Sequence, residues 1–229
     1  HDNLNYAENA AAFNLALRSR WNPRMATFAS VQHDRRFGEE AAALAAGVTL
    51  HFSPRQSLTA AGSIADDSGI VPRTQAEFEY CRGIHLSDHG PVRGIEALYR
   101  QRWLWYRDTR LVVLSPGAVL YLPRDWNWML QLSGSRLAAG GDRPEWKPSV
   151  STRLSFPLGS RLGGYVLFAA GIENFAYADQ IARYSMRTWG AGLRFKLPAG
   201  QEILGHSHYQ RYSRGQSLVN AGVSYVVRF

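Results

Sequence analysis

The sequence predicts an all-β fold: a transmembrane, antiparallel, up-and-down β-barrel of about 12–14 strands. Three observations predict it. Apolar and polar residues alternate over most of the chain, the alternating segments are long, and tight Pro- or Gly-marked turns separate them. The chain has 229 residues, of which 45% are hydrophobic, so it can bury a core or cover a lipid-facing surface. We expect a single barrel domain over residues 1–229.

Alternation is clearest near the N-terminus, where Phe13, Leu15 and Leu17 are separated by Asn14 and other non-apolar or small residues. Side chains on a strand point alternately to its two faces, so such a segment has one apolar face and one polar face. The same alternation recurs in residues 150–156, 189–197 and 217–229.

Segment length separates a membrane barrel from a soluble sandwich. A transmembrane strand needs roughly 9–11 residues, whereas soluble strands average about 5–6. Most of the alternating segments match the membrane value. We predict strands at residues 12–22, 25–34, 41–52, 57–66, 75–86, 94–105, 109–122, 125–137, 147–157, 161–174, 184–197, 201–212 and 217–229.

The connections predict which ends of the strands meet. Tight turns follow the first strand at Asn22-Pro23-Arg24 and recur after every second strand. Between them lie polar links at Asp34–Glu40, Asp66–Thr74, Arg136–Pro148 and Glu173–Met186. Short periplasmic turns and longer extracellular loops are typical of outer-membrane barrels.

Thirteen strands is an awkward number, because bacterial barrels close with an even count. Three explanations stay open. Residues near Asn3–Ala7 form a short closing strand, a hairpin is miscounted, or a first strand lies in polypeptide outside these residues.

Composition excludes several other classes of protein. No run of eighteen apolar residues is present, so a helical membrane protein is not expected. The net charge of +8 comes from 24 arginines and two lysines spread over the whole chain, whereas nucleic-acid sites cluster their charges. The lone Cys81 excludes a disulfide framework. His1 opens a polar stretch rather than a secretory leader, so we expect a mature form or a fragment.

The C-terminal segment carries the most specific signal. A polar residue, a glycine two positions later, alternating apolar or aromatic residues and a terminal Phe resemble the β-signal that is read by the barrel-assembly machinery. The alternative is an ordinary edge strand that ends in Phe. The residues concerned are Asn220, Gly222, Tyr225, Val227 and Phe229.

The layout of the chain also resembles the YaiO-like outer-membrane barrels, which are related to the porin domains of exopolysaccharide and cellulose secretion proteins. The resemblance implies a location in the bacterial outer membrane and a role in polysaccharide export, and it implies no catalytic residue. The N-terminal helical repeats of exopolysaccharide porins are missing. The matching stretches are Gly94–Trp105, Thr109–Leu122, Arg124–Leu137, Thr188–Lys196 and Gln210–Phe229.

Contact with lipid decides which face of each strand points outward, because Arg or Lys on the lipid face costs about 2–4 kcal/mol at the midplane. The alternating polar residues of each strand are therefore predicted to face the lumen. Opposite charges could form a plug of ion pairs, or the excess of arginine could form a basic channel for anionic or polyhydroxylated solutes. The predicted lumen residues are Arg18, Arg20, Glu77, Glu79, Glu96, Arg100, Arg102, Arg153, Arg194, Lys196, His206, His208 and Arg228.

Two histidine motifs raise other possibilities. His206 and His208 share a face with Glu202 and could bind a metal, but hydrogen bonding in the lumen is the better hypothesis. His85-x-Ser87 is similar to the His/Ser pair of outer-membrane phospholipases but lacks a third member, so no enzyme and no cofactor are predicted. Five tryptophans near strand ends at outward parity predict interfacial girdles: Trp103, Trp105, Trp126, Trp128 and Trp189. Tyr99 and Tyr209 also face out, so stacking of sugars in the lumen has little support.

The predicted function is an outer-membrane channel for a polysaccharide or small anionic solutes. The alternative is a scaffold barrel with a plugged lumen that anchors an envelope complex. A small barrel enzyme ranks third. The expected partners are outer-membrane lipid, including lipopolysaccharide, the barrel-assembly machinery and other envelope proteins, with no nucleic acid.

Overall fold

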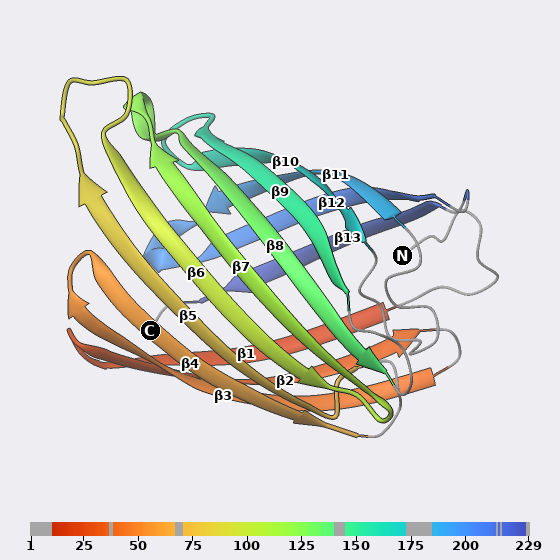
Figure 1. The fold of residues 1–229 in the computed structure, drawn as a ribbon. Coiled ribbons are helices and arrows are strands. Elements are labelled where there is room, and N and C mark those ends of the chain that lie inside the picture. Colours follow the sequence, from red (N-terminus) through yellow and green to blue (C-terminus); the bar gives the residue numbers. More distant parts are fainter. Residues whose placement is uncertain are drawn as a thin grey trace.

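The computed structural model describes residues 11–36, 39–66, 71–139, 145–172, 185–213, 215 and 217–227. Within them, thirteen antiparallel strands form one sheet, in which each strand pairs with its neighbours in the sequence. Figure 1 shows these long, tilted strands rolled around a common axis. The strands are β1 (Ala11–Asn22), β2 (Met25–Arg36), β3 (Glu39–Ser53), β4 (Gln56–Ala65), β5 (Thr74–His85), β6 (Gly94–Trp105), β7 (Thr109–Tyr121), β8 (Asn127–Ala139), β9 (Trp146–Pro157), β10 (Leu162–Ile172), β11 (Ser185–Lys196), β12 (Glu202–Tyr212) and β13 (Ser217–Val226).

All thirteen predicted strands are present, so the predicted fold class is confirmed. Their order around the sheet equals their order in the chain, as in an up-and-down barrel. Two short 3-10 turns, η1 (Pro123–Asp125) and η2 (Pro198–Gly200), are the helical pieces among the described residues. In that part of the chain, no helix has the length and apolarity needed to cross a bilayer.

Strands extend into two of the predicted polar links, so the bounds of these links were predicted too wide. At Asp34–Glu40, β2 runs on to Arg36 and β3 begins at Glu39, with Arg35 paired opposite Glu40. At Arg136–Pro148, the strands likewise extend inward and pair Arg136 with Trp146. These predictions were wrong because charged residues mark where the apolar surface ends, whereas the backbone hydrogen bonds continue beyond it.

The connections gather at two ends of the sheet, seen at the left and right of Figure 1. We call the end where β1 turns into β2 the turn end, and the opposite end the loop end. The predicted difference in length between the two ends has exceptions. The connection at residues 86–93 is long although it lies at the turn end, and that at residues 106–108 is short although it lies at the loop end.

The strand registers assign every strand residue to one of two faces, because residues paired across neighbouring strands share a face. We call the face that carries the buried side chains the inner face. Its buried side chains are Ala26, Asp34, Ala41, Thr49, Leu104, Thr109, Leu111, Val113, Ser115, Ser135, Thr188 and Tyr212.

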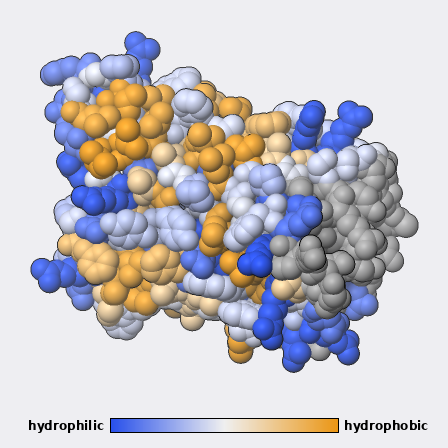
Figure 2. All heavy atoms as spheres, viewed as in Figure 1, coloured by the Kyte–Doolittle hydropathy of each residue, from blue (hydrophilic) through white to orange (hydrophobic). Residues whose placement is uncertain are grey.

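The opposite, outer face exposes large apolar side chains. Leu17 is 67% exposed, Leu132 55% and Leu193 54%, and all three belong to this face by register. Figure 2 shows apolar patches over the outer surface and hydrophilic side chains gathered at the ends. An exposed apolar surface of this extent is typical of a face that contacts lipid or a partner.

Aromatic residues of the outer face lie towards both strand ends. Near the loop end, Trp189 stacks on Tyr209 with ring centroids 6.0 Å apart. At the turn end, Trp126 contacts Phe156 with centroids 5.3 Å apart, and Trp128 Nε1 donates to Thr152 Oγ1 at 2.6 Å. An amphipathic ring with a satisfied polar atom suits the boundary between hydrocarbon and water.

The first and last strands are edges of the described sheet. β1 pairs with β2 and β13 pairs with β12, and no ladder joins β1 to β13 in the ranges the structure covers. Both edges are exposed: Phe13 is 64% accessible and Val223 is 79% accessible. The predicted closing strand near Asn3–Ala7 lies outside the described residues.

Candidate channel interior

The predicted lumen residues are brought together on the inner face by the strand registers. Arg18 pairs opposite Phe28, Glu77 opposite Arg102, and Lys196 opposite Glu202, all at inner parity. Whether they line a path for solutes stays a prediction, and Arg228 lies outside the described residues. The predicted residues on this face are Arg18, Arg20, Glu77, Glu79, Glu96, Arg100, Arg102, Arg153, Arg194, Lys196, His206 and His208.

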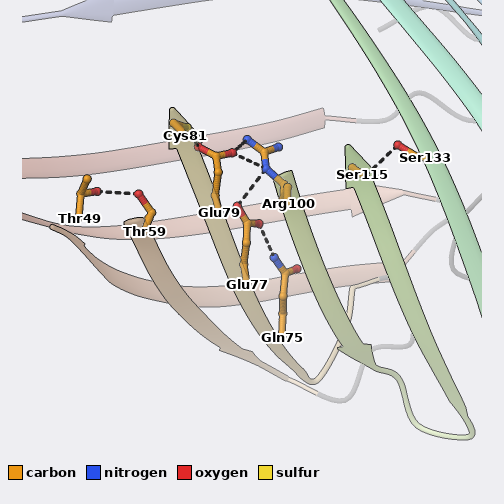
Figure 3. Close-up of polar contacts among 9 residues, drawn as sticks. All are labelled: Thr49, Thr59, Gln75, Glu77, Glu79, Cys81, Arg100, Ser115 and Ser133. Atoms are coloured by element: carbon orange, nitrogen blue, oxygen red, sulfur yellow. Dashed lines mark hydrogen bonds and ion pairs between the residues drawn. The ribbon is translucent and has the colours of Figure 1, made fainter. Parts of the chain in front are cut away.

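An ion-pair cluster occupies the inner face of β5 and β6 (Figure 3). Arg100 reaches across the strand pair and donates to Glu79 Oε2 through Nε at 2.6 Å and through Nη2 as well. The same Nε lies 3.4 Å from Glu77 Oε1. One guanidinium thus compensates two carboxylates, whose mutual repulsion would otherwise be unfavourable in a partly desolvated site.

Polar neighbours extend this cluster along β5. Gln75 Nε2 donates to Glu77 Oε2 at 3.5 Å, and Cys81 Sγ lies 3.7 Å from Glu79 Oε1 (Figure 3). Each of these contacts joins residues two apart, which share a face of the strand. Towards the turn end, the third acid of this wall, Glu96, accepts a hydrogen bond from Tyr121 Oη at 2.7 Å.

Arg102 lies opposite Glu77 in the register and is half-buried. Its Nε is buried without a hydrogen-bond partner among the described residues. β5 and β6 together therefore carry three acids and two arginines on the inner face, most of them already in contact with one another. We call this region the paired wall.

A second group of charges lies across β9 to β12, near the turn end. Arg153, Arg194 and Lys196 are exposed on the inner face and help to line a cavity of about 530 Å³, together with Arg161 from the β9–β10 turn. Asp125 is the one acid among the described residues that line it. We call this region the basic wall.

Arg153 is held in place within the basic wall. Its guanidinium carbon lies 4.7 Å from the centroid of the Tyr165 ring, and its Nε donates to Ser155 Oγ at 3.1 Å. Neither contact neutralises the charge, since one is a cation–π interaction and the other a hydrogen bond to a hydroxyl. Arg153 therefore has two contacts that hold its side chain, and neither is with an acid.

Glycines make room for the flat side chains of this region. A Cβ at Gly222 would lie 2.6 Å from His206 Cε1, and Cβ atoms at Gly190 and Gly192 would clash with the His208 and Tyr165 rings. His206 and His208 stack with centroids 5.1 Å apart, and His208 Nε2 is buried without a hydrogen-bond partner in the described part of the chain.

The metal and catalytic alternatives gain no support from the described residues. No group of three His, Cys, Asp or Glu side chains among them is arranged to hold a metal ion. At the β5–β6 connection, His85 Nε2 lies 3.4 Å from Asp88 Oδ1, whereas Ser87 Oγ accepts the His89 backbone N–H at 3.2 Å. No hydrogen bond joins Ser87 to His85 in the described structure.

The C-terminal motif is described up to Val227. Asn220 and Gly222 lie on the inner face, opposite His208 and His206, and Tyr225 on the outer face donates to Gln201 Oε1 at 2.8 Å. Its role in assembly stays a prediction, and Phe229 lies outside the described residues.

Comparison with known proteins shows a likeness of structure and none of sequence. No family model matches the chain, so the resemblance to YaiO-like barrels is not confirmed, and no curated protein is similar to it in sequence. The crystal structure of Pseudomonas aeruginosa OprD matches with a TM-score of 0.56 and 13% identity, over 93% of this chain and 70% of that one. OpdO of the same organism matches with a TM-score of 0.53 and 10% identity, over 95% and 70%. A further structure of OprD, described as an outer membrane protein, has a TM-score of 0.53. The likeness establishes the barrel fold.

Proposed function

We propose that this protein is a channel of the bacterial outer membrane and that its interior favours anionic solutes. The basic wall carries the proposal: Arg153, Arg194 and Lys196 line a cavity of about 530 Å³ with a single acid, Asp125, among its described lining residues. Rings or clusters of one charge on a pore wall select ions of the opposite charge.

The paired wall supports this selectivity by contributing little opposing charge. Arg100 bonds to Glu79 and lies against Glu77, so these carboxylates are compensated before any solute arrives. In the basic wall, Arg153 and Arg194 make no ion pair with an acid among the described residues, although Glu202 lies opposite Lys196 in the register. A concave surface with low-dielectric walls and one excess charge concentrates counter-ions, so an anion entering the interior would be drawn to β9–β12.

The location in the outer membrane rests on the outer face. Its large apolar side chains, the aromatic residues towards both strand ends and the likeness to outer membrane protein OprD all fit a barrel in a bilayer. A β-barrel is also suited to span a bilayer, because its backbone N–H and C=O groups form hydrogen bonds between neighbouring strands.

Reversal of the charge on the basic wall tests the proposal. We expect purified wild-type barrel to conduct in planar bilayers with an anion preference, and the variant R153E/R194E/K196E to prefer cations. The reversal potential across a salt gradient measures this preference. R82E is the matched control, because Arg82 lies on the outer face of β5; it should leave the potential unchanged. A sealed barrel would overturn the channel, and an unchanged potential in the triple variant would overturn the role of the basic wall.

A plugged scaffold barrel is the second candidate. The ion pairs of the paired wall favour it, as does an apolar cluster of Leu104, Leu111 and Val113 on the inner face near the loop end. This candidate predicts no conductance in the same experiment.

Polysaccharide export is a narrower form of the channel proposal and rests on the resemblance to YaiO-like barrels. It would give an anionic oligosaccharide, such as an oligouronate, a stronger block of the current than a neutral oligosaccharide of equal length. Equal block by both would leave the basic wall without a role in sugar binding.

A further inference from the structure

Four exposed arginines of the outer face lie at one end of the barrel. Arg110 on β7, Arg136 on β8, Arg187 on β11 and Arg211 on β12 are all exposed and all belong to the outer face by register. Each lies within a few residues of the loop end of its strand. We call these four residues the arginine collar.

The collar places like charges next to one another. Arg187 and Arg211 are direct partners across β11 and β12. Arg110 pairs with Ala138 and Val112 with Arg136, so Arg110 and Arg136 are diagonal neighbours across β7 and β8. Like charges directly opposite each other destabilise a strand pair, and no ion pair joins any of the four to an acid among the described residues. An anion between the guanidinium groups would remove this repulsion.

Aromatic side chains locate the collar relative to the membrane. Trp105 pairs opposite Arg110, Trp146 opposite Arg136, and the stacked Trp189 and Tyr209 lie two residues from Arg187 and Arg211 on the same face. Tryptophan and tyrosine favour the boundary between hydrocarbon and headgroups. Guanidinium groups at the level of these aromatic rings, or just beyond it, lie among the lipid headgroups. There the free-energy cost of a charged side chain on the lipid face is small.

At the turn end, the outer face of the described strands carries no matching set of charges, and the arginines of that end lie in the turns, as Arg24, Arg55 and Arg161 do. On the outer face of the described strands there, Arg82 is the one arginine, and the neighbouring positions are occupied by residues such as Ile84, Trp128 and Phe195. The asymmetry matches that of an outer membrane, whose outer leaflet consists of phosphorylated glycolipid. The collar and the glycolipid phosphates carry opposite charges.

We infer that the arginine collar binds the phosphate groups of outer-leaflet glycolipid, with Arg187–Arg211 and Arg110–Arg136 as two separate clamps. Guanidinium groups bind phosphate through paired N–H···O bonds, and two adjacent arginines can share one phosphate. The inference rests on the proposed location in the outer membrane but not on conductance, since it concerns the outer face alone. It also sets the orientation of the barrel, with the loop end at the cell surface.

Binding of defined glycolipids tests the inference. Refolded wild-type barrel in detergent is titrated with diphosphorylated lipid A and with the same lipid A after removal of its phosphates, and the bound fraction is measured by native mass spectrometry. We expect the wild type to prefer the phosphorylated form. Each arginine near an anionic surface contributes about 1 kcal/mol, so R187Q/R211Q should weaken binding of the phosphorylated form by about thirtyfold and leave the other form unchanged.

Matched variants separate the collar from general charge effects. R110Q/R136Q removes the second clamp and should weaken binding in the same way, whereas R187K/R211K keeps the charge and should retain most of the binding. R82Q removes one outer-face arginine at the turn end and should bind as the wild type does. Heat-modifiable migration checks that every variant is folded. Equal binding of both lipid A forms by the wild type, or an equal loss in R82Q, would overturn the inference.

Discussion

At the scale of single residues, the inner face depends on small side chains as much as on charged ones. Tyr165, which carries Arg153 on its ring, lies over Gly192 on the neighbouring strand. His206 and His208 lie over Gly222 and Gly190 in the same way. A glycine opposite a ring removes the Cβ that would lift the ring away from the sheet, so these rings lie flat and the space above them stays open.

This arrangement predicts that G192A destabilises the barrel. The added Cβ would clash with the Tyr165 ring, and overpacking of this kind costs about 1–3 kcal/mol. G205A is the matched control, because a Cβ at Gly205 on the adjacent strand meets nothing within 4 Å. Urea unfolding in lipid vesicles, followed by tryptophan fluorescence, measures both. A midpoint for G192A equal to that of G205A would contradict the tight contact.

At the scale of the strand, alternation was sufficient to predict all thirteen strands, because a transmembrane strand must present an apolar face to lipid along its whole length. The strand ends were harder to predict. Asp34 stands at the boundary between the predicted strand 25–34 and the predicted link Asp34–Glu40, and in the structure it lies on the inner face of β2, is 1% exposed and accepts a hydrogen bond from Gln32 Nε2 at 2.5 Å. Polar residues inside a barrel follow no hydrophobicity rule, so they resemble loop residues.

The terminal strand leads to a prediction about assembly. Deletion of Phe229, or its replacement by Asp, should sharply reduce the amount of folded barrel in the membrane while synthesis stays normal. The reason is the pattern from Asn220 to Phe229, of which β13 presents Asn220 and Gly222 inward and Tyr225 outward. Heat-modifiable migration of membrane fractions measures folding, and S224A serves as a control that changes the same strand but keeps every named residue of the motif. Wild-type levels of folded barrel without Phe229 would contradict the motif.

At the scale of the whole molecule, the alternation of side chains along each strand predicted which charged residues share the inner face. It did not predict which of them contact one another. Arg100 lies opposite Glu79, and Arg102 opposite Glu77, because of the register between β5 and β6. The connection at residues 86–93 does not fix that register from sequence, since a long link permits several pairings. The separation of a paired wall from a basic wall therefore became visible only in the structure.

Strand direction carries the last prediction. Neighbouring strands are antiparallel throughout, so β1 and β13 run in the same direction, both towards the turn end. If they closed the barrel directly they would pair in parallel, which bacterial barrels avoid. If they stayed unpaired, each backbone N–H and C=O along both edges would cost several kcal/mol in hydrocarbon. We predict that one more antiparallel strand lies between them, supplied by residues near Asn3–Ala7 or by polypeptide outside these 229 residues.

Cysteine crosslinking measures this closure. In a C81S background, which removes the one native thiol, single cysteines at residues 2–7 combined with single cysteines at 219–225 should form disulfides in the membrane-inserted barrel if the closing strand is local. Cysteines at 13–19 combined with those at 219–225 should stay reduced, because a strand about 4.8 Å from each neighbour would hold the two edges about 10 Å apart, beyond the roughly 7 Å at which a disulfide can form. Efficient crosslinking of 13–19 directly to 219–225 would mean that β1 and β13 meet in parallel and that no further strand is needed.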